Sequence, residues 1–217
     1  MDEFAAAREQ MVAWQIEKRG ITNHAVLNAM RSVPRHLFIP PEYVAEAYAD
    51  CPLPIGYGQT ISQPYIVALM TQLLQLTGKE NVLEIGTGCG YQAAVLSLLA
   101  HEVHSVEIIA PLTAETQKRL DRLGYNNVSV HLGDGSLGWQ PNAPYDAIMV
   151  TAHAPKAPPA LLEQLKPSGR LVLPVGSRNR QWLQYWRCEN GVWQEESLIP
   201  VAFVPLRGEH GWQNEEE

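Results

Sequence analysis

The chain has 217 residues, of which 46% are hydrophobic and 18% are charged, so it is long enough to bury the core of one large globular domain. Its formal net charge of -7 argues against a general nucleic-acid binder, which carries a basic surface patch. The cysteines lack C-x-x-C spacing, no apolar run reaches membrane length and the acidic start has no signal-peptide pattern, so we expect a cytoplasmic protein without disulfides.

The N-terminal part of the chain is predicted to be helical. Apolar residues at helical spacing predict an amphipathic helix over residues 2–18, which Gly20 ends. A second helix is expected over residues 23–31, with Thr22 as its cap.

Prolines and glycines recur between Ser32 and Pro64 and exclude long helices there. A loop region of this length in a compact domain is usually functional. It ends in the run G-Y-G-Q-T-I-S-Q-P, and a helix is expected from Pro64 to Leu76. Ser62 lies just before that helix, so its hydroxyl is a candidate cap as well as a candidate site residue.

The stretch from Val82 to Gly90 reads V-L-E-I-G-T-G-C-G and predicts a strand followed by a glycine turn. Good helix formers from Tyr91 to Ala100 predict a helix directly after it, which completes the opening of a nucleotide-binding βαβ unit. The dinucleotide fingerprint G-x-G-x-x-G would need a glycine where Tyr91 stands. The pattern E-x-G-x-G-x-G instead resembles motif I of S-adenosylmethionine-dependent methyltransferases, whose ligand needs close approach to the backbone.

The chain then alternates between strands and helices. Strands are expected over residues 103–106, 128–132, 145–150 and 171–175, and helices over 111–123 and 161–166. This alternation predicts an α/β fold with a doubly wound, mostly parallel sheet. Strands over 182–188 and 192–198 flank Asn190-Gly191, which predicts an antiparallel C-terminal hairpin. A last β-like run covers 201–204, and the residues after Gly208 are expected to be frayed.

Acidic residues stand at the ends of successive strands, where a doubly wound sheet binds its ligands. They are Glu84, Glu107 and Asp134. Glu107 comes about 20 residues after the glycine turn, where a carboxylate that binds ribose hydroxyls is expected. Asp134 lies between two glycines and can accept a hydrogen bond from an adenine amino group. His153 follows the fourth strand and stays open as a site candidate.

A zinc site is not expected. The run H-E-V-H at residues 101–104 is one residue short of the zinc motif H-E-x-x-H, and it lies at a helix-to-strand junction. The helical spacing that lets two histidines share one metal ion is therefore lost.

Motifs along residues 8–208 resemble the protein-L-isoaspartate (D-aspartate) O-methyltransferase family. They are Gly58 to Pro64, Leu83 to Gly90, Ser105 to Glu107, Gly133 to Gly135, Tyr145 to Ala152, Leu171 to Gly176 and Phe203 to Leu206. The first of these resembles the family's own signature, which general methyltransferases do not share. The chain departs from the family pattern at Ser136, where an aromatic residue is common, and at His153, where a small residue is usual.

The resemblance implies a Rossmann-like methyltransferase fold that binds S-adenosyl-L-methionine, releases S-adenosyl-L-homocysteine and needs no metal. It implies a cofactor site at Glu84, Ile85, Gly86, Thr87, Gly88, Gly90, Glu107, Gly133, Asp134, Gly135 and Thr151. It implies a substrate site at Thr60, Ile61, Ser62 and Val204, with Ser62 as the catalytic residue that positions the substrate carboxylate. The whole chain is then expected to be a single methyltransferase domain, with a helical and loop extension over 1–64, an α/β core over 65–208 and a frayed tail over 209–217.

The implied reaction is methylation of the free carboxylate of L-isoaspartyl and D-aspartyl residues in damaged proteins and peptides. The ester then closes to a succinimide, whose hydrolysis restores some normal aspartate. A carboxylate is already ionised at neutral pH, so no general base is required. The expected partners are damaged proteins and peptides, without nucleic acid or membrane, and the chain is expected to be a monomer. Two alternatives stay open: a methyltransferase for another carboxylate, with Ser136 and His153 altering substrate choice, and a non-catalytic S-adenosylmethionine-binding adaptor.

Overall fold

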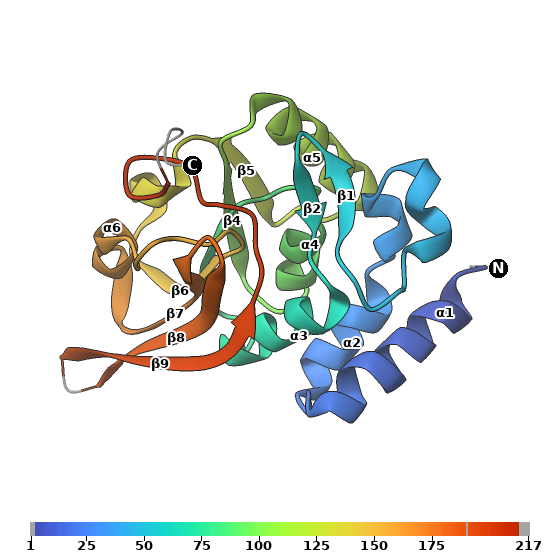
Figure 1. The fold of residues 1–217 in the computed structure, drawn as a ribbon, viewed down its shortest axis with the longest axis horizontal. Helices are drawn as coiled ribbons and strands as arrows, with labels where there is room; N and C mark the ends of the chain where they lie inside the picture. Colours follow the sequence, from blue (N-terminus) through green and yellow to red (C-terminus); the bar gives the residue numbers. More distant parts are fainter. Residues whose placement is uncertain (1–2, 190, 213–217) are drawn as a thin grey trace.

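A seven-stranded sheet in the order β5-β4-β3-β6-β7-β8-β9 forms the centre of the molecule (Figure 1). The computed structural model describes residues 3–189 and 191–212. The strands are β3 (Asn81–Ile85), β4 (Glu102–Glu107), β5 (Val128–Leu132), β6 (Tyr145–Val150), β7 (Leu165–Ser177), β8 (Arg180–Glu189) and β9 (Val192–Val201). A separate two-stranded hairpin consists of β1 (Leu53–Gly56) and β2 (Gln59–Ile61).

Strands β3 to β7 are parallel, and β8 and β9 continue the sheet in antiparallel register. Strand β3 lies between β4 and β6. The strands that directly follow β3 in sequence, β4 and β5, are added on one side of it, and the later strands are added on the other side. Ligands of doubly wound sheets bind at such a switch point, outside the carboxyl ends of the strands. The predicted doubly wound sheet with its antiparallel C-terminal hairpin is therefore confirmed.

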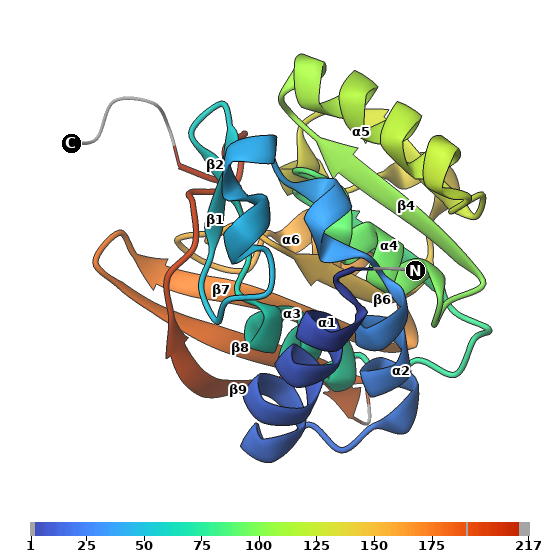
Figure 2. The same cartoon turned by 90° about the vertical axis from the view of Figure 1, so that its right-hand side faces the viewer.

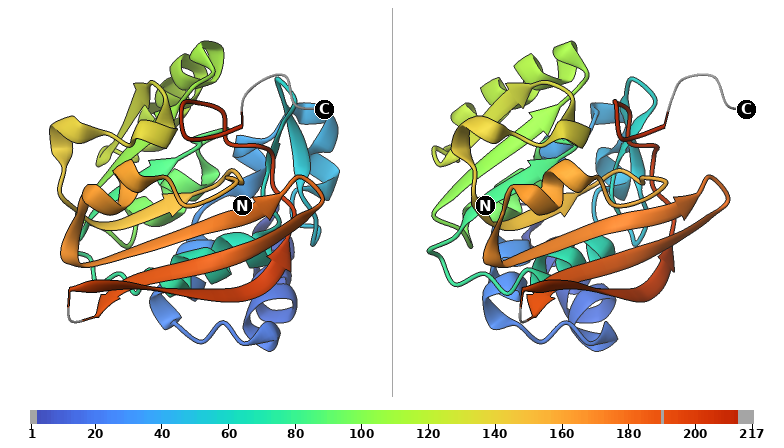
Figure 3. Two further views of the ribbon diagram at one scale, coloured as in Figure 1. Left: turned by 60° about the vertical axis from the view of Figure 1, so that its left-hand side comes forward. Right: turned by 90° about the vertical axis from the view of Figure 1, so that its left-hand side faces the viewer.

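Helices cover both faces of the sheet (Figures 2 and 3). They are α1 (Ala5–Gln10), α2 (His24–Ser32), α3 (Pro64–Leu73), α4 (Tyr91–Ser97), α5 (Ala110–Leu123) and α6 (Pro159–Glu163). Successive residues of a strand point to opposite faces, so in β3 Val82 enters the larger core under α1 to α5 and Leu83 enters the smaller core beside α6. Strands buried on both faces read as apolar runs, and Val82 to Ile85 does so apart from the buried Glu84. No helix in the two described ranges is long and apolar enough to cross a bilayer.

The N-terminal helix is less regular than its sequence predicts. After α1 it continues as a π-helical segment, Met11–Ile16, and a 3-10 turn, Glu17–Arg19, before Gly20 ends it in the left-handed conformation with φ +94°. The predicted cap of the next helix is wrong. Asn23 caps α2, because its side-chain oxygen accepts hydrogen bonds from the next residues' backbone N–H groups.

The region of residues 32–64 holds two 3-10 segments, Arg35–Phe38 and Pro41–Glu46, and the hairpin β1–β2 that periodicity did not predict. The tip of this hairpin turns through Gly56, Tyr57 and Gly58, all with positive φ. Glycine takes that conformation without strain, which explains the spacing of the two glycines. The hairpin lies beside α5, where the Tyr57 hydroxyl donates to Glu115 at 3.2 Å.

The C-terminal third differs from its prediction at three places. Helix α6 ends before Leu165, which pairs with Tyr145 as the first residue of β7. The β-like run predicted over 201–204 is not a strand of its own, since β9 ends at Val201. Residues 209–212 are not frayed, because the Trp212 N–H donates to the Leu206 carbonyl at 2.7 Å. Asn190 of the predicted hairpin turn and residues 213–217 of the predicted tail lie outside the described residues.

Candidate active site

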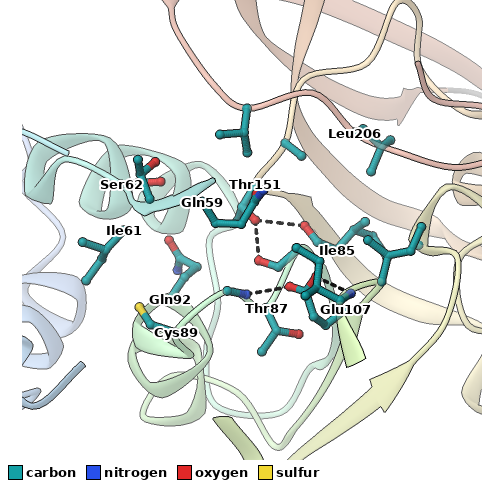
Figure 4. A pocket seen from close by; sticks show the side chains of 18 of the residues that line it. Gln59, Ile61, Ser62, Ile85, Thr87, Cys89, Gln92, Glu107, Thr151 and Leu206 are labelled. Carbon is teal, nitrogen blue, oxygen red and sulfur yellow. Dashed lines mark hydrogen bonds between the residues drawn. The ribbon is translucent and has the colours of Figure 1, made fainter. Parts of the chain in front are cut away.

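A pocket opens at the carboxyl ends of β3 and β4, between the hairpin β1–β2 and the segment after β9 (Figure 4). The predicted site residues that line it are Thr60, Ile61, Ser62, Ile85, Gly86, Thr87, Gly88, Glu107, Gly135, Thr151 and Val204. They come from six separate places in the sequence, and the switch point of the sheet brings them together.

Backbone rather than side chains forms the wall at the glycine turn. Gly86 has φ +95°, and a Cβ there would stand 2.5 Å from Thr151 Oγ1. Because Gly86 has no side chain, the Thr151 hydroxyl can approach its backbone and donate to the Gly86 carbonyl at 2.6 Å. Gly88 has φ +52°, and a Cβ there would stand 3.2 Å from Ile55 Cδ1 of the hairpin. A ligand can therefore lie directly against peptide groups at this turn.

Glu107 ends β4 and holds the glycine turn to that strand. Its carboxylate accepts the Gly88 N–H at 2.9 Å and the Ile109 N–H at 3.0 Å. Each carboxylate oxygen has more than one acceptor position, so both can still accept a hydrogen bond from a ligand hydroxyl. Glu107 is thus fixed in orientation and faces the pocket, as a carboxylate that binds vicinal hydroxyls requires.

Glu84 is fully buried in β3 and does not line the pocket. Burial raises its pKa to about 8, a hydrogen bond from Ser105 opposes that shift, and the Glu107 charge adds to it. The Ser105 hydroxyl donates to Glu84 at 2.5 Å and lies 2.6 Å from the hydroxyl of Thr87, which lines the pocket. Glu84 therefore supports the turn from behind and is mostly protonated at neutral pH.

The predicted residues Asp134, Gly90 and Gly133 are not part of the pocket wall. The Asp134 carboxylate accepts the Ser136 N–H at 2.9 Å and the Glu209 N–H at 2.8 Å, so it ties the C-terminal segment to the loop after β5. A Cβ on Gly90 would stand 2.6 Å from a methyl group of Thr116, so this glycine serves the close packing of α4 on α5.

A second pocket, of about 430 Å³, adjoins the first and lies between the start of α3 and residues 200–204. Thr60, Ser62, Thr151 and Val204 line both pockets, so Ser62 lies at their junction. Gln63 occupies the N-cap position of α3, and no side-chain capping hydrogen bond is made there among the described residues. Ser62 therefore does not cap α3, and the cap interpretation is wrong. Within the described ranges the Ser62 hydroxyl has no hydrogen-bond partner, so it is available to a ligand.

Comparison with known proteins identifies the family. Residues 6–211 match the family model described as protein-L-isoaspartate(D-aspartate) O-methyltransferase. The chain belongs to this family. The resemblance seen in the separate motifs is thereby confirmed over almost the whole length of the chain.

Relatives of similar length support the assignment to the isoaspartate methyltransferase family. The protein-L-isoaspartate O-methyltransferase of Geobacter metallireducens is 51% identical over 214 residues, which cover 98% of this chain and 99% of that protein. That of Dictyoglomus thermophilum is 53% identical over 98% of this chain and 96% of its own length. A solved protein-L-isoaspartate O-methyltransferase is 30% identical, with a TM-score of 0.86 over 94% of this chain and 67% of that one.

A more distant structure supports the fold alone. It is a Plasmodium falciparum protein described as a putative protein-L-isoaspartate O-methyltransferase in complex with S-adenosyl-L-homocysteine. It is 24% identical, with a TM-score of 0.79 over 92% of this chain and 98% of that one.

The two departures from the family pattern, Ser136 and His153, are away from both pocket walls. Ser136 is fully buried, and its hydroxyl donates to Asp134 at 2.7 Å. His153 is buried behind Val204, whose carbonyl accepts the His153 N–H at 2.8 Å. Neither side chain lines a pocket, so neither gives a reason to expect a different carboxylate substrate for this isoaspartate methyltransferase.

Sequence reasoning missed several residues of the first pocket. They are Gln59, Val67, Cys89, Tyr91, Gln92, Val106, Ile108, Ile109, Ala152, Pro205, Leu206 and Arg207. Ile108 and Ile109 directly follow Glu107, so the rule that ligands bind at strand ends would have found them. Pro205 and Leu206 belong to a motif that resembles the family, but nothing in the sequence places them at the first pocket, because they reach it only through the return of the chain after β9. Cys89 is an inert part of the wall, since burial raises the pKa of its thiol.

Proposed function

We propose that the first pocket holds S-adenosylmethionine, that the second holds an isoaspartyl peptide, and that Ser62 positions the carboxylate to be methylated. The chain belongs to a family of S-adenosylmethionine-dependent methyltransferases, and this proposal assigns its residues to that reaction. The observation that carries it is the place of Ser62, which lines both pockets with its hydroxyl unbonded within the described residues.

The first pocket fits S-adenosylmethionine in two respects. The ligand has no phosphate, and the wall at Gly86 and Gly88 offers it close approach to the backbone. Glu107 offers a fixed carboxylate for the ribose hydroxyls. Ile85, Thr87, Gly135 and Thr151 complete the wall.

The remaining cofactor residues act in this proposal from behind that wall. Glu84 supports Thr87 through Ser105, Gly90 sets the packing of α4, and Gly133 carries the chain from β5 to the loop. The Asp134 carboxylate accepts hydrogen bonds from the Ser136 N–H, the Ser136 hydroxyl and the Glu209 N–H, which leaves one acceptor position on Oδ2 for an adenine amino group.

The chain contributes positioning rather than acid–base chemistry. When bound, S-adenosylmethionine supplies an electrophilic methyl group on a positively charged sulfur. The substrate carboxylate, with an ordinary pKa of about 4, is ionised at neutral pH and needs no base. The Ser62 hydroxyl donates a hydrogen bond that orients this carboxylate, and the hairpin β1–β2 with residues 204–207 keeps water from the junction.

Substrate recognition in this proposal relies on backbone groups. Thr60 belongs to β2, beside Ile61, and Val204 to the segment after β9, so two backbone segments that are far apart in sequence line the second pocket. No hydrogen bond of the described residues uses the Val204 N–H. An extended peptide can pair with such groups whatever its side chains are, which suits an enzyme for damaged sites in many proteins. We further propose that the enzyme acts as a cytoplasmic monomer on damaged proteins and peptides.

Substitutions of Ser62 test the proposal. Ser62→Ala is expected to lower turnover of an isoaspartyl peptide well beyond any loss of melting temperature, with affinity for S-adenosylhomocysteine nearly unchanged. Ser62→Asp is expected to be worse, because it opposes the substrate carboxylate with a like charge, and Ser62→Thr is expected to keep part of the activity. Steady-state methylation and thermal melting of these variants provide the measurement. A well-folded and fully active Ser62→Asp enzyme would contradict the positioning role.

A further inference from the structure

Residues 202–206 lie outside the sheet and line the pockets in turn, with 202–204 at the second pocket and 204–206 at the first. Strand β9 ends at Val201, which is paired with Gln181 of β8, and the chain then leaves the ladder. Ala202, Phe203 and Val204 line the second pocket. An irregular segment of this kind keeps one conformation only where other groups satisfy its peptide bonds.

Gln181 takes the place of a strand partner for this segment. Its buried side-chain oxygen accepts the Phe203 N–H at 2.7 Å, and its side-chain nitrogen donates to the Phe203 carbonyl at 3.2 Å. An amide side chain that bonds both groups of one residue reproduces the hydrogen bonds of a neighbouring strand. The Gln181 side chain thus continues the hydrogen-bond ladder beyond Val201, where the backbone pairing of β8 with β9 ends.

The side chain of His153 bonds to the same residue, Phe203. Its Nδ1 lies 2.9 Å from the Phe203 carbonyl, and because a carbonyl only accepts hydrogen bonds, Nδ1 carries the proton. The backbone of His153 also accepts the Leu206 N–H and donates to the Val204 carbonyl, both at 2.8 Å. Its Nε2 is buried with no hydrogen-bond partner in the described ranges. Burial and the nearby Arg178 charge lower the pKa of His153, so the ring is neutral.

We propose that His153 and Gln181 are positioning residues for the substrate, because together they fix the Phe203 peptide and so keep Val204 at the wall of the second pocket. This inference rests on the proposed function, in which that pocket holds the isoaspartyl peptide. Neither side chain lines a pocket, so both act only through the segment of residues 202–206.

The proposal separates substrate binding from turnover. A segment without these hydrogen bonds must be ordered when the peptide binds, and that cost weakens binding. Once the peptide is bound the segment is in place, so the methyl-transfer step is unchanged. KM for the peptide therefore rises while kcat stays the same. A purely structural role would instead lower the folded fraction, which reduces apparent kcat and leaves KM unchanged.

The experiment compares His153→Leu and Gln181→Met with two further variants. His153→Asn keeps a donor near the position of Nδ1 and serves as the conservative variant. Gln184→Met is the matched control on the same strand, because Gln184 bonds to Glu195 and Trp186 and has no bond to residues 202–206. The measurements are kcat and KM for an isoaspartyl peptide, the Kd of S-adenosylhomocysteine, the melting temperature and hydrogen exchange of the Phe203 and Val204 amides.

His153→Leu and Gln181→Met are each expected to raise KM about tenfold, the equivalent of one hydrogen bond, with kcat and Kd within about twofold of wild type. Exchange of the Phe203 amide is expected to accelerate in both. His153→Asn is expected to recover most of the loss, and Gln184→Met to keep the wild-type KM.

Three results would overturn the inference. If the wild-type enzyme is active, an unchanged KM in both variants would show that the two residues are only structural. A loss of activity that follows the melting temperature, as in Gln184→Met, would show the same. A wild-type enzyme that does not methylate the peptide would overturn the proposed function and this inference with it.

Discussion

The buried carboxyl of Glu84 predicts how the stability of the protein depends on pH. Its pKa is raised from 4.5 to about 8 by burial, so between these values the folded chain holds a proton that the unfolded chain has released. Stability then falls as pH rises, because the native state binds more protons than the unfolded state. The Glu84 contribution is fully present below pH 4.5 and is lost as pH rises to about 8.

Glu84→Gln removes this titration and keeps an oxygen to accept the Ser105 hydrogen bond. One pKa unit corresponds to about 1.4 kcal/mol, so a shift of this size contributes on the order of 5 kcal/mol across the full window. Relative to wild type, the variant is expected to gain several kcal/mol of unfolding free energy between pH 5 and pH 8. Urea unfolding of both proteins at several pH values measures the difference, and other titrating groups cancel in it.

Glu163→Gln provides the control, because Glu163 is an exposed glutamate on α6. The same substitution at this exposed position is the reference against which the pH dependence of Glu84→Gln is compared. If Glu84→Gln shows a constant offset from wild type across this pH range, Glu84 is ionised in the folded protein and the reasoning about its burial is refuted.

Two further substitutions test the cofactor pocket. Gly88→Val is expected to abolish binding of S-adenosylhomocysteine in calorimetry, since Gly88 lines the pocket, whereas Gly124→Val shares the left-handed backbone strain in open space and is expected to lose stability only. Normal binding by a folded Gly88→Val protein would remove the turn from the site. Glu107→Gln is expected to weaken the same ligand by about 1.5–3 kcal/mol, because a hydrogen bond to a charged group is lost. Unchanged affinity would exclude Glu107 from the ribose site.

The sequence predicts the central sheet well because its signals there are local. The apolar run before Gly86, the glycines after it and the Asn190-Gly191 signal all depend on neighbouring residues. The hairpin β1–β2 was missed because its strands are short and hold neither the alternation nor the length that periodicity detects. The helix predicted over 161–166 ends early because pairing of Leu165 with Tyr145, twenty residues away in sequence, outweighs local preference.

The candidate site was predicted where one strand end defines it and missed where distant segments meet. Glu107, Gly86 and Gly88 follow from the rule for ligand binding at the carboxyl ends of parallel strands. The same rule predicts that Asp134 lies at the site, but Asp134 does not line the pocket. The rule takes no account of the C-terminal segment, whose Glu209 N–H donates to the Asp134 carboxylate. The residue pair His153 and Gln181 has no sequence signal, because their common partner, Phe203, is defined only by the folded chain.

The most direct test of the central claim compares two peptides that differ only in one linkage. Transfer of a labelled methyl group from S-adenosylmethionine is measured with an L-isoaspartyl peptide and with its normal aspartyl twin. Methylation of the isoaspartyl peptide alone, with most of it lost in Ser62→Ala, is the predicted result. Equal methylation of both peptides, or binding of S-adenosylmethionine with no transfer to either, would contradict the account.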